Sequence, residues 1–350
     1  MPTVACGHDP LERLANEGVP LLLRVILSVC CVVWMTSAIA ALRLDCYQHA
    51  DKALTVHAGG DFVDPYFANR ALITAHQLGL DIQPVAREWI EWALAHQAAD
   101  GRFARYCLHA KQQWQRCAKA DADDAVLALW QQLLYIVSAR DALHGPWRVS
   151  VQQAQKQLAR LHDPRRGIYL VSQTQRFGLL MDNVEIYDAL NTIARQQHRL
   201  GAAASANATA THAAKLQQAI NHVFWRSETQ TYAVTTRKDG HESFYPHVVA
   251  QVYPWLFAMP TPVNTQQAYQ RWRARYAEPW LSFTQDKYPW GLVAAAAAQL
   301  GDNATAKRWL QHASALRHGK RWNILEEAIY QALAQKYALP FELDCKRDKS

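Results

Sequence analysis

The stretch from Ala120 to Tyr135, ADADDAVLALWQQLLY, decides the fold, and a second stretch from Met181 to Leu190, MDNVEIYDAL, repeats its design. Each stretch opens on carboxylates and continues directly into an apolar segment with the 3.6-residue period of a helix. Each also follows an irregular loop that carries aromatic residues. The same order of loop, helix, short turn and helix recurs along the chain. It predicts consecutive helical hairpins whose loops gather on one face.

Apolar periodicity predicts five hairpins and the first helix of a sixth. The expected helix pairs are 66–78 with 84–96, 122–143 with 147–161, 183–200 with 211–225, 246–258 with 265–276, and 290–300 with 304–316. The Ala/Ser/Thr-rich segment 201–210 is expected to be a mobile linker. Residues 323–337 open the sixth hairpin, whose partner is either missing or supplied by the residues before 57.

The loops of this pattern also recur at a fixed interval. Turn-forming loops near residues 101, 167 and 232 are spaced by about 65 residues, which indicates a repeated supersecondary unit. We therefore predict an all-α fold, a closed (α/α)6 toroid of helical hairpins with short β-hairpin loops on one face. An open α-solenoid is the alternative.

The first forty residues have the pattern of an export signal. Arg13 and Arg24 precede an apolar run over residues 25–41, with small residues at Ala38 and Ala40. The run is short for a membrane span, which needs about 20 apolar residues. Residues 1–40 are therefore predicted to be a cleaved signal peptide or a retained membrane anchor. Residues 41–350 form the predicted catalytic-like domain, periplasmic or secreted, which meets the membrane only through that segment if it is retained.

The cysteines agree with export. Of the 7 cysteines, four lie beyond the leader, at Cys46, Cys107, Cys117 and Cys345. An even number of cysteines in an exported chain indicates disulfides. Of the three possible pairings we favour Cys107–Cys117, which closes one loop, with Cys46–Cys345, which ties together the ends of the domain. Four free thiols are the alternative.

Charge and motif content narrow the classes of ligand. The formal charge is +7, but lysine and arginine are scattered, with no run suited to a phosphate backbone, so we expect no nucleic-acid partner. An acidic substrate or an anionic envelope surface is favoured. The 15 histidines are dispersed without metal-binding spacing, and the sequence has no P-loop, GxGxxG or GxSxG motif. We expect neither a metal nor a cofactor.

In such a toroid the inner helices begin at one face, so polar residues at their starts converge there. The catalytic candidates are the carboxylates of Asp124 and Asp182 first, then Asp123, Glu185 and Asp64. The substrate-binding candidates are Tyr66, Tyr245, His247, Tyr288, Trp290, Trp322 and Glu326. In glycoside hydrolysis one carboxylic acid protonates the leaving oxygen while a second carboxylate activates water or attacks the anomeric carbon. Aromatic rings bind the apolar faces of pyranoses.

Several of the acids and aromatic residues at the helix starts also have a purely structural explanation. Asp121 and Asp182 each precede another acid, Asp124 or Glu185, by three residues, as in a capping box. Acids also favour the first turn of a helix because of its dipole. For Asp64 the alternative is helix capping, and for His247 it is a structural hydrogen bond. For Trp290 and Trp322 the alternative is packing in the core.

These features resemble the six-hairpin glycosidase superfamily. The resemblance covers roughly residues 57–337, through the hairpin plan, the loop QAADGRF at 97–103 and the acid-rich helix starts. In the periplasmic cellulase-like branch, an aspartate at an inner-helix start is similar to Asp123 or Asp124. The proton-donor glutamate motif of that branch is absent, so Asp61 or Asp64 would take its place. The resemblance implies an exported enzyme that cleaves a polysaccharide or oligosaccharide by carboxylate acid/base catalysis.

Two other functions remain open at this stage. Asp121-Ala-Asp-Asp124 spells the DxDD proton-donor motif of class II terpene cyclases, and residues 97–103 are similar to their Gln/aromatic repeat. A non-catalytic glycan-binding or polysaccharide-assembly protein would use the acids only as helix caps. We take the glycoside hydrolase as the leading hypothesis, and the basic balance weakly favours an anionic carbohydrate.

Overall fold

The computed structural model describes residues 40–110, 113–138, 143, 145–238, 240, 242–341 and 345. The chain divides into two units, residues 1–39 and residues 40–350. The predicted signal peptide or anchor falls on the first unit and lies outside the described residues. No helix within the described ranges combines the length and the apolar character that crossing a bilayer requires.

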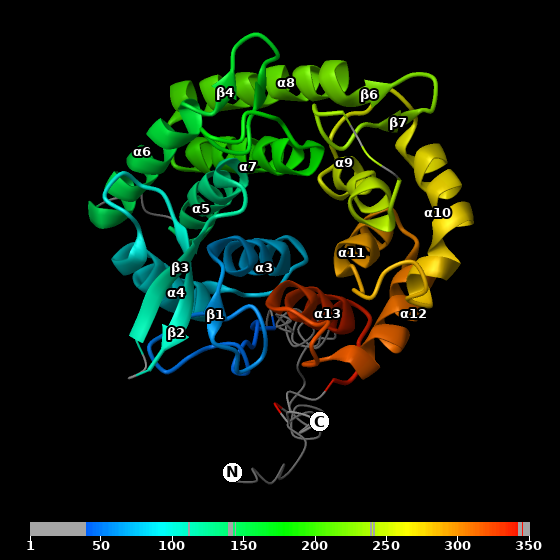
Figure 1. Cartoon of the computed structure of the whole chain (residues 1–350), viewed down its shortest axis with the longest axis horizontal. Coiled ribbons are helices and arrows are strands. Elements are labelled where there is room, and N and C mark those ends of the chain that lie inside the picture. Colours follow the sequence, from blue (N-terminus) through cyan, green and yellow to red (C-terminus); the bar gives the residue numbers. More distant parts are fainter. Residues whose placement is uncertain are drawn as a thin grey trace, which may run out of the picture. The chain divides into compact units, whose positions relative to one another are not determined.

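Within the second unit, the described α-helices form a ring of two layers (Figure 1). The inner layer consists of α3 (Pro65–Gln77), α5 (Asp123–Val137), α7 (Leu180–Arg199), α9 (Tyr253–Leu256), α11 (Gly291–Gln299) and α13 (Ile324–Lys336). The outer layer consists of α4 (Gln83–His96), α6 (Gly145–Ala159), α8 (Ala203–Phe224), α10 (Thr265–Leu281) and α12 (Asn303–Ala313). The ring is closed because α13 packs against α3. The predicted all-α toroid is therefore confirmed, and the open solenoid is wrong.

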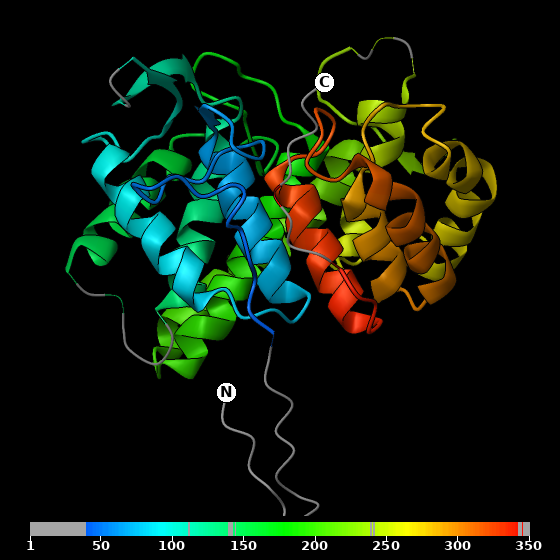
Figure 2. The ribbon, with the colours of Figure 1, turned by 90° about the horizontal axis from the view of Figure 1, so that it is seen from below.

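The short strands lie in the loops that lead from an outer helix to the next inner helix, except β1, which lies in the segment before α3 and pairs with β2. They form three antiparallel groups: β1 (Phe62–Val63), β2 (Ala104–His109) and β3 (Gln113–Lys119); β4 (His162–Asp163) and β5 (Ile168–Tyr169); β6 (Trp225–Arg226) and β7 (Thr231–Tyr232). Figure 2 shows these loops together at one end of the helices. We call this end the loop face; its loops are 97–122, 160–179, 225–252, 282–290 and 314–323.

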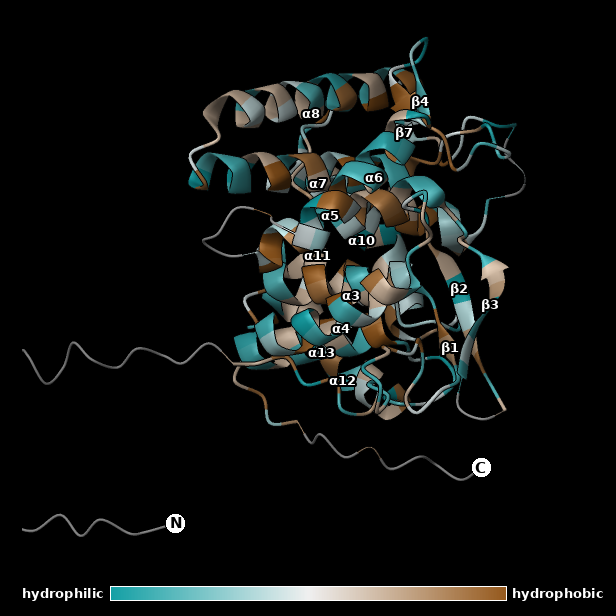
Figure 3. Cartoon of the chain, turned by 90° about the vertical axis from the view of Figure 1, so that its left-hand side faces the viewer, coloured by the Kyte–Doolittle hydropathy of each residue, from teal (hydrophilic) through white to brown (hydrophobic). Residues whose placement is uncertain are grey.

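Burial differs between the two layers in the way their sequences require. The inner helix α5 has no exposed residue, and α11 (GLVAAAAAQ) is buried from Gly291 to Ala298. The outer helix α8 buries only a single stripe, from Ala206 through Leu216 to Phe224. Figure 3 shows hydrophilic and hydrophobic residues interspersed along α8. A helix that is apolar all round must be covered on all sides, whereas an amphipathic helix suits the outside.

Two expectations about the helices are wrong, and one open alternative is decided. Segment 201–210 is not a linker, because α8 already begins at Ala203, where alanines favour helix. Residues 246–258 do not form one helix: a π-helical turn, Phe244–Val248, precedes the short α9, and Pro254 lacks the N–H needed to continue a helix. The described residues before 57 form turns and isolated bridges, so they supply no helical partner for α13.

Both predicted disulfides are formed. Cys107–Cys117 joins β2 to β3, and Cys46–Cys345 joins residues 299 positions apart. Such bonds are typical of proteins in oxidising compartments outside the cytoplasm.

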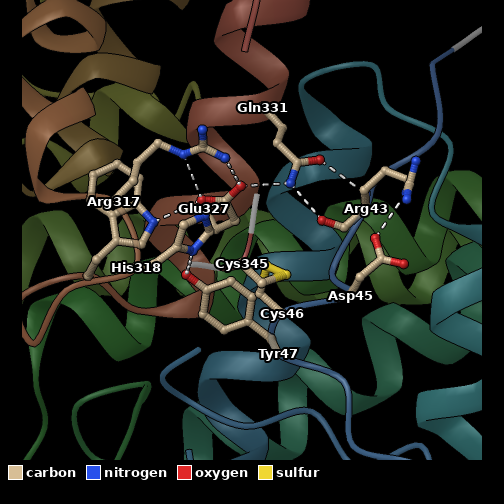
Figure 4. A network of polar contacts seen from close by, with 10 residues as sticks. Arg43, Asp45, Cys46, Tyr47, Arg317, His318, Glu327, Gln331 and Cys345 are labelled. Atoms are coloured by element: carbon tan, nitrogen blue, oxygen red, sulfur yellow. Dashed lines mark hydrogen bonds and ion pairs between the residues drawn. A yellow bond between two sulfur atoms is a disulfide. The ribbon is translucent and has the colours of Figure 1, made fainter. Parts of the chain in front are cut away.

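A polar network surrounds the second disulfide (Figure 4). Arg317 donates to Glu327 at 2.6 Å, and the Gln331 side chain bonds both the carbonyl oxygen and the N–H of Arg43, at 2.6 and 3.0 Å. Glu327 and Gln331 belong to α13, so the network fixes the segment that follows residue 40 to this helix.

Candidate acid site

Residues 169–171, at the end of β5 and just after it, hold the starts of two inner helices together. The backbone N–H groups of Asp123 and Asp124 donate to the carbonyl oxygen of Val171, at 2.9 and 3.4 Å. On the other side, the Asn183 side chain of α7 accepts from the N–H of Tyr169 at 2.7 Å and donates to its carbonyl at 3.0 Å. One short segment therefore fixes α5 relative to α7. Their first turns carry Asp124 and Asp182.

Asp124 and Asp182 form a buried carboxyl pair. The two residues are only 0% and 7% exposed, and the Oδ2 atom of each is buried without a hydrogen-bond partner. Burial raises the pKa of Asp124 to about 7. Burial, with the charges of Asp124 and Glu185, raises the pKa of Asp182 well above its ordinary value. Two carboxyl groups buried beside one another do not both ionise readily, so the pair retains a proton at neutral pH, held mainly on Asp182.

Glu185 lies one turn further along α7, and a buried cation lies beside it. Its Oε1 accepts from the Tyr66 hydroxyl at 2.9 Å and lies 3.5 Å from Nε of Arg70, with both charged side chains fully buried. Burial raises the pKa of Glu185 to about 7, against the opposing effect of Arg70. The Arg70 guanidinium also stacks over the Phe257 ring at 4.4 Å. We call Asp124, Asp182 and Glu185 the acid cluster.

Stacked aromatic side chains lie near the acid cluster. The rings of Tyr245 and Trp290 are 4.6 Å apart and 15° from parallel, and Tyr288 meets Trp290 edge-on at 6.1 Å. Burial of its hydroxyl, and then the charge of Asp182, raise the pKa of Tyr245 to about 12, although 47% of this residue is exposed. Trp290 has φ 47°, a left-handed conformation uncommon for a residue with a side chain. We call these three residues the aromatic platform.

The capping explanation holds for Asp64 alone. Asp64 caps α3 by accepting from the N–H of Tyr66 at 3.0 Å, and it also binds Arg105 at 2.8 Å. The cap of α5 is Ala122, and the Asp121 side chain is 86% exposed and 3.3 Å from Arg105. The cap of α7 is Leu179, so Asp182 lies inside the helix. The capping-box explanation of Asp121 and Asp182 is therefore wrong.

Asp123, the other acid of the DxDD motif, points away from this arrangement. It is half-buried at the first position of α5 and lines a cavity of about 410 Å³ with Arg102 and Lys119. Burial raises the pKa of Asp123, and Arg102 opposes that change. The structure thus separates Asp123 from its neighbour Asp124, which lines no part of that cavity.

Three predicted substrate-binding residues lie elsewhere. Trp322 is 0% exposed, stacks on Trp309 at 6.0 Å and donates to Glu327, so a sugar-stacking role for it is wrong. Glu326 is buried, has its pKa raised to about 8 by burial, and accepts from the N–H of Gly291 at 2.7 Å. It therefore holds the start of α11 below the aromatic platform. His247 accepts from the N–H of Ser243 and lines a separate cavity of about 480 Å³.

Two residues of the site were missed by sequence reasoning. Arg70 stands in the apolar helix ANRALITA, where an arginine without a nearby acid in the sequence is a signal for a buried partner. Tyr253 is buried near Glu185 and Arg70, and burial with the charge of Glu185 raises the pKa of its hydroxyl. Its place depends on the irregular turn before α9, which no pattern indicated. In the described part of the chain, no group of three metal-ligating side chains is placed to hold an ion.

Comparison with known proteins supports the architecture. No protein-family model matches the sequence, and no curated protein matches it either. Among solved structures, the fold is similar to a GH63 mannosylglycerate hydrolase from Thermus thermophilus in complex with glucose, with 13% identity, 84% of this chain and 98% of that chain covered, and a TM-score of 0.53.

Two further solved structures agree. A glycosidase variant in complex with glucose shares 13% identity over 95% of this chain and 100% of its own, with a TM-score of 0.55. A rhamnosidase from Klebsiella oxytoca with rhamnose bound shares 10% identity over 78% of this chain and 58% of its own, with a TM-score of 0.54. The chain therefore has the six-hairpin glycosidase fold. Identities this low establish the fold alone.

Proposed function

We propose that this protein is a glycoside hydrolase that acts on a polysaccharide or oligosaccharide outside the cytoplasm. The observation that carries the proposal is a proton-sharing carboxyl pair, Asp124 and Asp182, beside an exposed aromatic platform. Glycoside cleavage needs a carboxylic acid that is still protonated near neutral pH and aromatic faces against which a sugar ring can stack. The glycosidase fold and the two disulfides support the class of reaction and the compartment.

In this proposal Asp182 is the general acid. Its proton passes to the glycosidic oxygen as the bond from that oxygen to the anomeric carbon breaks, and the pair is left with both carboxylates ionised. Water activated by a second carboxylate, or that carboxylate itself until water displaces it, forms the new bond to the anomeric carbon. Asp124 keeps the proton in place before the reaction. The negative charges that then remain on Asp124 and Glu185 stabilise the positive charge that develops on the sugar ring. Arg70 limits this excess of negative charge, because it lies 3.5 Å from Glu185.

Asp124 is not the second, opposed carboxylate of the reaction. In glycosidases the two carboxyl groups are about 5–9.5 Å apart, which leaves room for the sugar and water, whereas the carboxyls of Asp124 and Asp182 are buried beside one another and shift one another's pKa. The second carboxylate must ionise, which disfavours Glu326 with its pKa of about 8. Burial also raises the pKa of Asp64, but Arg105 opposes this, so Asp64 at the start of α3 is the better candidate.

The same contact favours a second function, that of a non-catalytic glycan-binding protein. Asp124 and Asp182 are 0% and 7% exposed and their Oδ2 atoms are buried, so the pair presents little of either carboxyl group to solvent. In that case the aromatic platform would bind a glycan, and the acid cluster would only join α3, α5 and α7.

A turnover assay distinguishes the two functions. The purified protein is incubated with a panel of acidic and neutral polysaccharides, and new reducing ends are measured alongside binding. We expect release that is abolished by Asp182→Asn and unchanged by Asp121→Asn, a matched change at an exposed carboxylate of the same face. Binding without release, with both variants equal to the unmodified protein, would contradict the hydrolase and establish the binding protein.

A further inference from the structure

The charge of this protein is concentrated at one end of the ring. The described residues of the loop face contain fifteen lysines and arginines against six aspartates and glutamates, an excess of nine positive charges where the whole chain has +7. The described residues of the turns at the other end (78–82, 138, 143, 200–202, 257–264 and 300–302) contain two aspartates and no lysine or arginine. The scattered lysines and arginines of the sequence are thus brought together by the topology.

Cations from separate loops lie near the acid site. Arg105 reaches Asp64 and Asp121 at the starts of α3 and α5. The Arg237 guanidinium lies 3.6 Å from the centre of the Phe177 ring. Arg237 and Phe177 belong to segments that join at the Leu179–Thr235 bridge, immediately before α7 and its Asp182.

A further loop adds a cation beside the aromatic platform. The Lys287 ammonium lies 5.2 Å from the centre of the Tyr288 ring. Arg105, Arg237 and Lys287 therefore place positive charge near the starts of α3, α5, α7 and α11.

Several of these cations have no acidic partner. Among the described residues, Lys119, Arg176, Arg237, Lys238 and Lys287 form no ion pair within 4.0 Å. Arg237 and Lys287 instead lie over aromatic rings, which favours a fixed position for the charge. Unpaired cations on one face attract an anionic ligand and concentrate it there.

We propose that the loop face recognises a polysaccharide that carries carboxylate groups, and that such a polyuronate is the substrate class of the proposed hydrolase. Alternation of arginine or lysine with aromatic rings matches a chain in which each sugar offers an apolar face and a carboxylate. The cations stand in separate loops around buried acids. An anionic membrane would instead be met by cations and apolar side chains along one amphipathic surface. This inference rests on the proposed function for its catalytic half only.

The experiment compares one polymer in two charge states. Binding of the purified full chain to a polyuronate and to its carboxyl-reduced, neutral derivative is measured at low and high salt. We expect tighter binding to the polyuronate, and loss of that preference in high salt because surface charges are then screened. The double variant Arg237→Gln with Lys287→Gln is expected to weaken polyuronate binding roughly tenfold at low salt. Lys307→Gln is the matched control and should change nothing, because this exposed lysine also lies over a tyrosine ring but is near the start of the outer helix α12, at the end away from the loop face.

Several outcomes would refute the inference, and one would separate it from the proposed hydrolase. Equal affinity for the two polymers, or the same loss with Lys307→Gln, would refute the inference. So would tighter binding to vesicles of anionic phospholipid than to the polyuronate, since the face would then be a membrane surface. Cleavage of the neutral polymer alone would also refute it and leave the hydrolase standing. Preferential polyuronate binding without any cleavage would support the inference and contradict the hydrolase.

Discussion

Replacing Asp124 by asparagine should stabilise the protein at neutral pH. The pKa of this carboxyl is about 7 in the folded state, against about 3.9 in an unfolded chain. A carboxyl whose pKa is raised on folding costs nothing below pH 4, and it destabilises the fold progressively as pH rises from about 4 to 7. A difference of about 3 pKa units corresponds to about 4 kcal/mol above pH 7. Because Asp124 is fully buried, solvent screening reduces this little.

Asparagine should preserve the local contacts. Its amide oxygen can accept from the N–H of Ala125, as Oδ1 of Asp124 does at 2.9 Å, and its NH₂ group can donate to Asp182 in place of the shared proton. The free energy of unfolding is measured in urea between pH 4 and pH 8. We expect the variant and the unmodified protein to be equal near pH 4 and to diverge by several kcal/mol at pH 8, with the variant the more stable.

The control for this experiment is Asp121→Asn. That carboxyl is 86% exposed on the same loop, so its removal should leave the pH dependence of stability unchanged. Parallel stability curves for Asp124→Asn and the unmodified protein would refute the shared proton. A gap that narrows as pH rises would do the same, because it would mean that Asp124 ionises readily in the fold.

Three further substitutions test the packing around the site, each by urea denaturation. Gly291→Ala would place a Cβ 2.5 Å from Glu326 Oε2 and 2.9 Å from the Trp309 ring, so we expect a loss of about 1–3 kcal/mol; an unchanged midpoint would contradict this close approach. Arg70→Met should cost about 3–5 kcal/mol at pH 8 and less at pH 5, where Glu185 protonates, and a loss independent of pH would contradict the ion pair. Cys46→Ser should cost about 2–5 kcal/mol, and adding Cys345→Ser should cost no more because both substitutions remove the same bond; an unchanged midpoint would contradict a stabilising disulfide.

Much of this architecture could be predicted from local sequence. Inner helices such as α5 and α11 are apolar nearly all round, whereas the outer helix α8 buries a single stripe. The hairpins and their two layers therefore follow from apolar periodicity. The pairing Cys46–Cys345 could be chosen because a ring brings the ends of a chain together. Segment 201–210 was misjudged because small polar residues suit a helix surface as well as a linker.

The acid site could be predicted only in part. Asp124 and Asp182 were identified from their places at helix starts, but their mutual contact depends on the hydrogen bonds of Val171 and Asn183. Those bonds lie between segments distant in sequence. The core position of Trp322 was left open for the same reason, since a tryptophan after a polar loop suits a platform and a core equally.

If Asp182 protonates the glycosidic oxygen, its replacement should slow cleavage most where the leaving group needs that proton. Cleavage of the natural glycan is compared with cleavage of an aryl glycoside of the same sugar, whose leaving group departs without protonation. For Asp182→Asn we predict a loss of about 10²- to 10⁴-fold on the glycan and little loss on the aryl glycoside. Equal losses on both substrates, or no loss on the glycan, would contradict the account.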